Sequence, residues 1–353
     1  MNILFLTNEL NYTDGVSAHL YYLIKNLLKH ADLNLHLICG GGDALEKFRD
    51  LKIEIISERI FNHKYRSTGN FIGAFNFTRK FVRSNNIELV HSHNHYAANI
   101  ANYVSKFSDI ITFQTNHGII PDKGRLKHFS ADKYIVVNNY ISDYLTENNT
   151  ALPENIFMIF SGVDFENGKY DKNFNPAKVI SASRLEKGKG LDTIIKAVSL
   201  LSPDVKKKAE FIIAGEGSMK NELEKLNAEM NTGIIFPGNL KNIRDVFKKS
   251  EIFISASQSE GLPISMLEAA AEKNLIISSD FRGVESIIEN NKDGLVFGMN
   301  NASELASMIT FALNNKDHVY EMTENLFLKA RIKFNSDIMA DKHYSIYRKV
   351  IAK

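Results

Sequence analysis

The residues with the clearest chemical potential lie in SQSEGLPISMLEAAAEKN, residues 257–274, which carries Glu260 and Glu268 eight positions apart. Gly261 allows the backbone to approach a ligand closely, and Pro263 suits the first position of a helix. The N–H groups in the first turn of that helix favour an anion. An anion flanked by carboxylates that accept hydrogen bonds from hydroxyl groups fits a sugar nucleotide better than a metal or a peptide.

A second interpretation of this stretch is a capped amphipathic helix whose two carboxylates are both solvated. Glu268 argues against it, because it stands in MLEAAA among residues that prefer burial. A carboxylate in that position is more easily explained if a ligand covers it. We therefore expect a ligand site in residues 257–274.

Other segments with chemical potential follow other predicted strands. After KVISAS, Arg184 and Lys189 stand five positions apart on a glycine-punctuated loop, and two such cations suit a diphosphate. After FIIAG, Gly215 and Gly217 bracket a turn, and after LIISS comes DFRGVES with Arg282. Each segment alone is compatible with a solvated turn. Four strand ends that carry glycines, cations or carboxylates indicate one common site.

The elements that must position these residues are predicted by short apolar runs that alternate with helix-like stretches. This pattern predicts parallel sheets covered by helices on both faces, and ligands of such sheets bind beyond the carboxyl ends of the strands. The runs lie at 2–7, 33–39, 53–56, 87–92, 109–115, 133–137 and 156–160, and again at 178–183, 211–215, 233–238, 251–257, 275–279 and 294–298. The polar interval 166–177 predicts a linker, and helices are expected from Leu191, Met219, Arg244 and Val284 and in the tail from about residue 301.

Composition restricts the class of protein. A chain of 353 residues is comfortable for two domains, and a net charge of +2 is too small to predict nucleic acid as a partner. Cys39 is the only cysteine, so no disulfide framework or cysteine-rich zinc site is expected. The N-terminal run MNILFLTNEL is too short for a signal peptide or a membrane span. We expect a cytoplasmic protein, and a position at the inner face of the cell membrane is compatible with this expectation.

The order of these motifs resembles the retaining glycosyltransferases of family 4, glycosyl transferases group 1, which have the GT-B fold. The resemblance covers the C-terminal half and rests on a combination that is specific to the family. Its elements are Arg184-x4-Lys189-Gly190, the turn and helix GEGSMKNELE at 215–224, Glu260-x7-Glu268 with GLP inside, and SSDFRGVESIIENNKDGLVF at 278–297. Arg282 replaces a glycine that is common in the family beside Gly283.

The N-terminal half resembles the family more loosely. IELVHSHNHYAA (His91, His93, His95) is similar to the family's strand-end histidine segment, and FQTNHGI is similar to the segment that places a histidine near the donor sugar. MIFSGVDFE, residues 158–166, is similar to the motif that closes the first domain. TDGVS, residues 13–17, has one glycine where many relatives have two.

The resemblance implies a role for each matched residue. Arg184 and Lys189 would neutralise the leaving diphosphate, Glu260 would lie against the donor sugar, and His117 would contact the donor sugar or the reacting face. Glu268 would bind the ribose hydroxyls. The remaining expected donor-binding residues are Gly15, Gly215, Gly238, Asn239, Gly261, Leu262 and Pro263. No cofactor and no metal are expected, since fixed cations and a helix N-terminus stabilise the leaving group.

The resemblance also implies an architecture and an activity. We expect two doubly wound Rossmann-like domains facing a cleft, an acceptor-side domain over 1–168 and a nucleotide-sugar domain over 177–335, with a C-terminal helix at 336–353 that returns to the first domain. The expected reaction moves a hexose or N-acetylhexosamine from a nucleotide sugar, with UDP favoured and GDP an option, to a hydroxyl acceptor in a surface glycan or glycolipid. The alternatives are a GT-B sugar-nucleotide 2-epimerase and a non-catalytic nucleotide-binding subunit.

The acceptor is expected to be a glycan or a lipid-linked glycan. Candidate acceptor-side residues are Asp14, His93, Lys123 and Arg125. Residues 59–83 carry six basic and six aromatic side chains and no acidic one. This composition is compatible with an anionic membrane surface, and also with a helix that buries Phe71, Phe75 and Val82 and leaves its cations in solvent.

Overall fold

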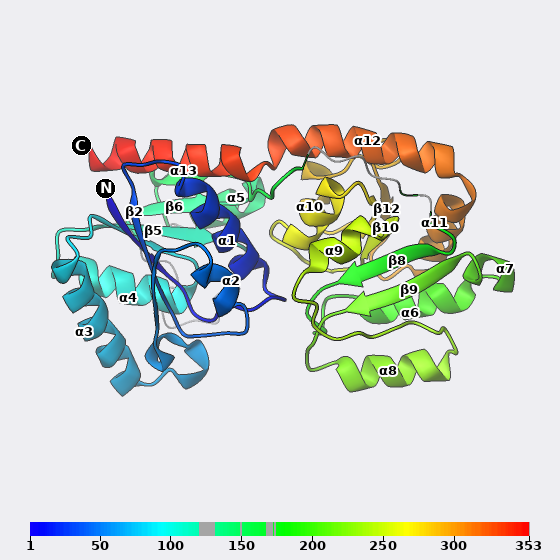
Figure 1. The fold of residues 1–353 in the computed structure, drawn as a ribbon, viewed down its shortest axis with the longest axis horizontal. Coiled ribbons are helices and arrows are strands. Elements are labelled where there is room, and N and C mark those ends of the chain that lie inside the picture. Colours follow the sequence, from blue (N-terminus) through cyan, green and yellow to red (C-terminus); the bar gives the residue numbers. More distant parts are fainter. Residues whose placement is uncertain (120–130, 149, 167–171, 173, 353) are drawn as a thin grey trace. The chain divides into compact units, whose positions relative to one another are not determined.

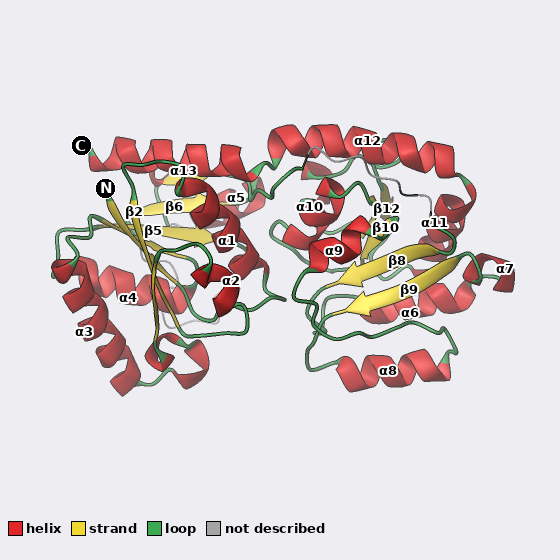
Figure 2. Cartoon of the chain, viewed as in Figure 1, coloured by secondary structure: helices red, strands yellow, loops and turns green. Residues whose placement is uncertain are grey.

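The computed structural model describes residues 1–353 apart from 120–130, 149, 167–171, 173 and 353. The chain divides into two compact units, Met1–Gly162 with Ser336–Lys353, and Val163–Asn335. Each unit has its own parallel sheet and its own helices (Figures 1 and 2). Half of the predicted linker at 166–177, namely 167–171 and 173, lies outside the described residues.

The first unit is built on seven parallel strands in the order β3-β2-β1-β4-β5-β6-β7. The strands are β1 (Asn2–Leu6), β2 (Asn34–Cys39), β3 (Glu54–Ser57), β4 (Leu89–Ser92), β5 (Ile111–Asn116), β6 (Lys133–Val136) and β7 (Ile156–Met158). The helices are α1 (Gly15–Leu27), α2 (Leu45–Arg49), α3 (Thr68–Ser84), α4 (His95–Ser105), α5 (Asn139–Glu147) and α13 (Ser336–Ile351). All seven predicted strands are confirmed. They appear in the sequence as apolar runs because β1, β4 and β5 are buried along almost their whole length.

Helix α13 packs against α1 and thereby brings the C-terminus back to the first unit (Figure 1). The ring of Tyr344 stacks on His30 with a centroid distance of 4.0 Å, and Arg348 Nη1 lies 3.1 Å from Asp32 Oδ2. The predicted return of the C-terminal helix is confirmed.

Helix α3 covers the sheet of the first unit. It buries Ala74, Phe81 and Val82, and Phe71 and Phe75 pack against the same core. The interpretation of residues 59–83 as including a covering helix is therefore confirmed, and α3 lies beside α4 (Figure 2).

The second unit has five parallel strands in the order β12-β11-β10-β8-β9. The strands are β8 (Ala177–Ala182), β9 (Ala209–Ala214), β10 (Ile252–Ser255), β11 (Leu275–Ser279) and β12 (Leu295–Phe297). The helices are α6 (Leu191–Leu200), α7 (Pro203–Lys206), α8 (Lys220–Glu229), α9 (Ile243–Lys248), α10 (Ile264–Ala271), α11 (Ala302–Asn314) and α12 (Lys316–Lys333). The core lies between the strands and α6, α11 and α12, as its buried side chains show.

Two of the elements predicted for this unit are wrong. Segment 233–238 is no strand, because only Ile235 pairs with Ile212, as an isolated bridge. Gly233 has a left-handed φ of +70° and Pro237 has no N–H to donate, so pairing cannot continue on either side. The helix expected from Val284 is a single 3-10 turn over Val284–Ser286.

Candidate active site

The loop between β8 and α6, which carries the predicted cations, is fastened to two neighbouring loops of the second unit. Leu185 N donates to Glu216 O (2.9 Å) and Met219 N donates to Leu185 O (2.8 Å), which ties the loop to the turn after β9. Gln258 N donates to Gly188 O (2.8 Å), which ties it to the loop after β10. The structure thus brings together three of the four strand ends that the sequence singled out.

Glycines make this close approach of loops possible. A Cβ on Gly190, whose φ is +63°, would stand 2.0 Å from Ala256 O, and one on Gly215, whose φ is +139°, would stand 1.9 Å from Ser183 O. Both positions therefore require glycine for its conformation and for its size. The sequence indicated a glycine-rich turn, and the structure shows that the turn packs backbone against backbone.

Lys189 and Glu260, predicted from distant segments, are in contact. Lys189 Nζ lies 2.6 Å from Glu260 Oε1, and the two side chains are only 18% and 17% exposed. Glu260 thus fixes the ammonium group at the carboxyl edge of the sheet. Arg184, on the same loop, is exposed.

Glu268 is buried on α10 and is 6% exposed, as its apolar sequence context predicted. Leu262 is also buried, and none of the described side chains caps the helix by a hydrogen bond. Pro263 is the N-cap residue rather than the first helical residue, because its ψ of 109° is extended. The helix begins one residue later than expected, with its N-terminal turn four residues after Glu260.

The other predicted donor residues of this unit lie around the same loops. Gly215 N donates to Gly238 O (2.9 Å), and a Cβ on Gly238 would lie 2.8 Å from Glu216 Oε1. Asn239 is exposed next to Gly238. The fourth strand end joins the group because Ser279 Oγ donates to Ser257 O (2.6 Å).

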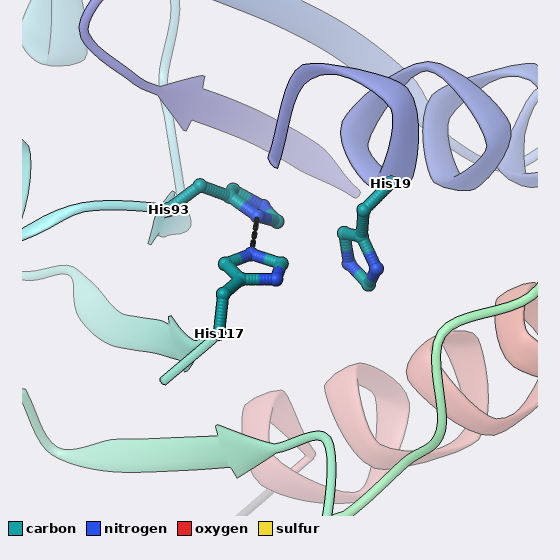
Figure 3. Close-up of side chains that lie close together, drawn as sticks. All are labelled: His19, His93 and His117. Carbon is teal, nitrogen blue, oxygen red and sulfur yellow. Dashed lines mark hydrogen bonds between the residues drawn. The ribbon is translucent and has the colours of Figure 1, made fainter. Parts of the chain in front are cut away.

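The first unit gathers histidines around the carboxyl ends of β4 and β5. His93 Nδ1 lies 3.3 Å from His117 Nε2, and the ring of His19, on α1, meets the edge of the His117 ring at a centroid distance of 4.6 Å (Figure 3). His91 bonds Tyr347 Oη (2.6 Å) and Thr115 Oγ1 (2.8 Å).

Burial holds these imidazoles neutral. It lowers the pKa values of His19, His91 and His93 well below 6.5, and neighbouring imidazoles add to the effect. Burial lowers the pKa of His117 to about 3 and that of His343, on α13, to about 4. The ring nitrogens of this cluster therefore act as neutral donors and acceptors at physiological pH.

We expect stability to fall steeply on acidification between pH 6.5 and about 4. The unfolded chain binds protons at these histidines in that window and the folded chain does not, so the free energy of unfolding decreases as the pH drops and is insensitive to them above pH 6.5. Each histidine that is protonated in the unfolded chain and neutral in the folded chain lowers the free energy of unfolding by about 1.4 kcal/mol for every pH unit of acidification.

Urea unfolding at several pH values in this range measures how the free energy of unfolding changes with pH. This change should be smaller for His343→Gln than for the unmodified protein and the same as in the unmodified protein for His63→Gln, a control at an exposed position. Equal changes with pH in all three proteins would contradict this account.

The remaining predicted residues of the first unit are dispersed. Asp14 is the N-cap of α1, where its Oδ1 accepts from Val16 N (3.3 Å), and Gly15 is the exposed first residue of that helix. Lys123 and Arg125 lie outside the described residues.

Sequence reasoning missed His19 and His343. Both occupy positions of amphipathic helices that also bury apolar residues, and both are 0% exposed. A histidine in the buried stripe of a helix is the signal that was available, and the sequence alone gave no reason to connect it with residues 93 and 117.

Two family models match the chain. The glycosyltransferase family 4 model matches residues 13–167, and the glycosyl transferases group 1 model matches residues 163–329.

Curated relatives and solved structures agree with these matches. The chain is 28% identical over 44% of its length to a Campylobacter jejuni alpha-1,4-N-acetyl-D-galactosaminyltransferase named for a diphosphoundecaprenol-linked glycan, and it spans 44% of that relative. It is 22% identical to the N,N'-diacetylbacillosaminyl-diphospho-undecaprenol alpha-1,3-N-acetylgalactosaminyltransferase of the same organism, over 97% of this chain and 99% of the other. The fold is similar to that of Anabaena HepE in complex with UDP-glucose, with a TM-score of 0.83 and 14% identity over 99% of this chain and 100% of the other. The protein has the GT-B fold and belongs to glycosyltransferase family 4, whose members transfer sugars from nucleotide sugars.

Proposed function

We propose that this protein is a retaining, metal-independent glycosyltransferase that moves a hexose or N-acetylhexosamine from a UDP-sugar to a lipid-linked glycan. The observation that carries the proposal is the 2.6 Å contact between Lys189 and Glu260, four residues before α10 begins. It holds an ammonium group and a carboxylate together beside an anion-favouring helix terminus. The names of the two Campylobacter relatives support an N-acetylhexosamine and a lipid-linked acceptor.

Each proposed role follows from the chemistry of the residue. Negative charge develops on UDP as the bond between the sugar and the diphosphate breaks, and Lys189 and Arg184 stabilise that charge where it develops. Glu268 accepts hydrogen bonds from the ribose hydroxyls, and His117 contacts the donor sugar. The backbone of Gly261–Pro263 lies along the sugar hydroxyls and phosphate. Since these cations supply the positive charge, the diphosphate needs no divalent ion.

The experiment that tests this function is transfer from UDP-GalNAc, UDP-GlcNAc and UDP-glucose to an undecaprenyl-diphosphate-linked glycan in the presence of EDTA. We expect UDP release that depends on the acceptor, and an α-linked product by NMR. Release of UDP without acceptor, with a change of configuration at C2 of the sugar, would instead support the 2-epimerase.

Loss of the Glu268 carboxylate is expected to weaken UDP binding by about 10- to 100-fold, because a hydrogen bond to a charged group contributes about 1.5–3 kcal/mol. UDP at 100 times its Kd stabilises the protein by about 2.7 kcal/mol, which a thermal-shift assay detects readily. Glu268→Gln should need a correspondingly higher UDP concentration for the same shift. Glu321→Gln, at an exposed position on α12, is the matched control. A Glu268→Gln response equal to that of the unmodified protein would remove the ribose assignment.

We further propose that the exposed side of α3 and α4 contacts an anionic membrane. Ile72, Tyr103 and Phe107 are 52%, 47% and 54% exposed, and Arg79 lies over the Phe107 ring at 5.4 Å. Exposed rings and aliphatic side chains among cations suit a surface of anionic headgroups. None of the helices in the described residues is long and apolar enough to cross a membrane.

Replacing both Tyr103 and Phe107 with serine is expected to reduce binding to phosphatidylglycerol vesicles at low salt by about tenfold, because two rings that insert into the membrane surface are lost. Sedimentation with vesicles measures the effect. Ile332→Ser on α12 is the matched control, because Ile332 is 75% exposed and lies in the second unit. If the control variant loses as much binding as the double variant, the contact is not at α3 and α4.

A further inference from the structure

Three histidines of the first unit bring their ring nitrogens together. His19, His93 and His117 each offer one nitrogen, and these three atoms lie within 4.8 Å of one another. His19 comes from α1, and the other two residues follow β4 and β5 (Figure 3). Among the described residues, no cysteine and no carboxylate belongs to this group.

The hydrogen bonds of these rings leave specific nitrogens unused. Nδ1 of His19 lies 2.9 Å from Ser161 Oγ, and Nδ1 of His93 lies 3.3 Å from His117 Nε2. The Nε2 atoms of His19 and His93 are buried and have no hydrogen-bond partner among the described residues. The two side chains are 0% and 2% exposed.

A fourth histidine repeats this pattern beside the group. His343 Nδ1 donates to Met339 O (2.8 Å), and a backbone oxygen only accepts, so Nε2 of His343 carries a lone pair. That Nε2 is also buried and has no partner among the described residues. The His343 ring lies 6.2 Å from the ring of His19.

Several buried imidazole nitrogens that have no hydrogen-bond partner among the described residues indicate a ligand-binding site. A buried polar atom without a partner costs about 1–3 kcal/mol, and native proteins contain few of them. Neutral imidazole nitrogens bind zinc, copper and nickel well, whereas magnesium and calcium prefer oxygen. Ser161 would act on His19 as an outer-shell partner does on a metal-binding histidine, by fixing the orientation of the ring.

We propose that His19, His93 and His117 form a binding site for a divalent transition-metal ion of the zinc class. Zinc–nitrogen bonds of about 2.1 Å at tetrahedral angles place ligand nitrogens roughly 3.4 Å apart. The ligand nitrogens, which lie within 4.8 Å of one another, must therefore move closer by up to about 1.4 Å, and the His93–His117 hydrogen bond must give way to the metal. Three protein ligands leave the fourth position to water.

A bound ion would also affect transfer, and this consequence depends on the function proposed above. An ion that holds His117 removes that ring from the donor sugar. Zinc is therefore an inhibitor, and a chelator restores activity. The metal site itself depends only on the geometry of the three histidines.

Titration of the tag-free full-length protein with Zn²⁺ and Co²⁺ tests the site. We expect one tightly bound ion per chain and the visible absorption of tetrahedral Co²⁺. His19→Gln and His93→Gln should each weaken binding by at least about tenfold, as the loss of one ligand of three should. His63→Gln, at an exposed position, controls for surface histidines, and circular dichroism with the UDP-induced thermal shift reports folding. Absence of stoichiometric binding, or folded His19 and His93 variants that bind as the unmodified protein does, would overturn the site.

Transfer assays with EDTA and with added Zn²⁺ separate the two proposals. Inhibition by zinc that is weakened in His19→Gln supports the regulatory effect. Stoichiometric binding without inhibition overturns that effect and leaves the site in place. Stoichiometric binding by a protein that transfers no sugar in EDTA counts against the proposed function, not against the metal site.

Discussion

Replacing Lys189 with alanine is expected to lower kcat by about 100- to 1,000-fold while the protein stays folded, which is the usual effect of removing one preorganised group that stabilises developing charge. Lys189 is positioned for this role because Glu260 holds its ammonium group at 2.6 Å and both side chains are largely shielded from solvent. A fixed cation needs little reorganisation when the leaving group becomes charged. Steady-state kinetics with a UDP-sugar and excess acceptor measure the effect.

The control for Lys189 lies on the same loop. Lys187 is exposed, so Lys187→Ala removes an equal charge from the same segment and should change kcat by less than about threefold, because exposed charges are screened by solvent. The UDP-induced thermal shift of each variant shows whether the fold and the nucleotide site persist. A Lys189→Ala enzyme with nearly normal kcat would refute the leaving-group assignment.

Replacing Gly215 with alanine is expected to lower the free energy of unfolding by about 2–6 kcal/mol. The added Cβ would stand 1.9 Å from Ser183 O, and the φ of +139° is nearly inaccessible to alanine. Backbone strain and overpacking each contribute about 1–3 kcal/mol. Because the neighbouring atom is a backbone oxygen, relief requires the loop after β8 to move, so activity should fall together with stability.

The variant Gly233→Ala separates the effect of backbone strain from the effect of overpacking. Gly233 also has a positive φ, of +70°, but a Cβ there would meet no heavy atom of the described residues within 4 Å. Its replacement should therefore cost only the conformational term, about 1–2 kcal/mol. Urea unfolding of both variants measures the difference. Equal losses for Gly215→Ala and Gly233→Ala would show that the contact with Ser183 does not hold the loop.

Local patterns in the sequence were enough for the sheets and for part of the site. Strands of a parallel sheet covered on both faces are apolar throughout, and this property is visible in runs such as NILFL, which forms β1. The carboxyl ends of such strands share one edge, so the meeting of the Arg184–Lys189 loop with the Glu260 loop could be expected from topology. The burial of Glu268 could be expected from its apolar neighbours.

The same local reasoning failed where pairing depends on neighbours. GIIFPG has the composition of a strand, but the left-handed Gly233 and the donor-less Pro237 limit it to one bridged residue. The extended ψ of Pro263 likewise moved the start of α10 by one residue.

The sequence by itself determined the fold class, the family and the segments that carry the catalytic candidates, because these follow from short-range periodicity and motif order. Only the tertiary structure decided that Lys189 contacts Glu260 and that His19 and His343 join His93 and His117. The sheet order β1-β4-β5 places the loops after β4 and β5 side by side, with α1 following β1, and the return of α13 adds His343. These residues are far apart in the chain, and contacts between distant segments depend on packing rather than on any local pattern.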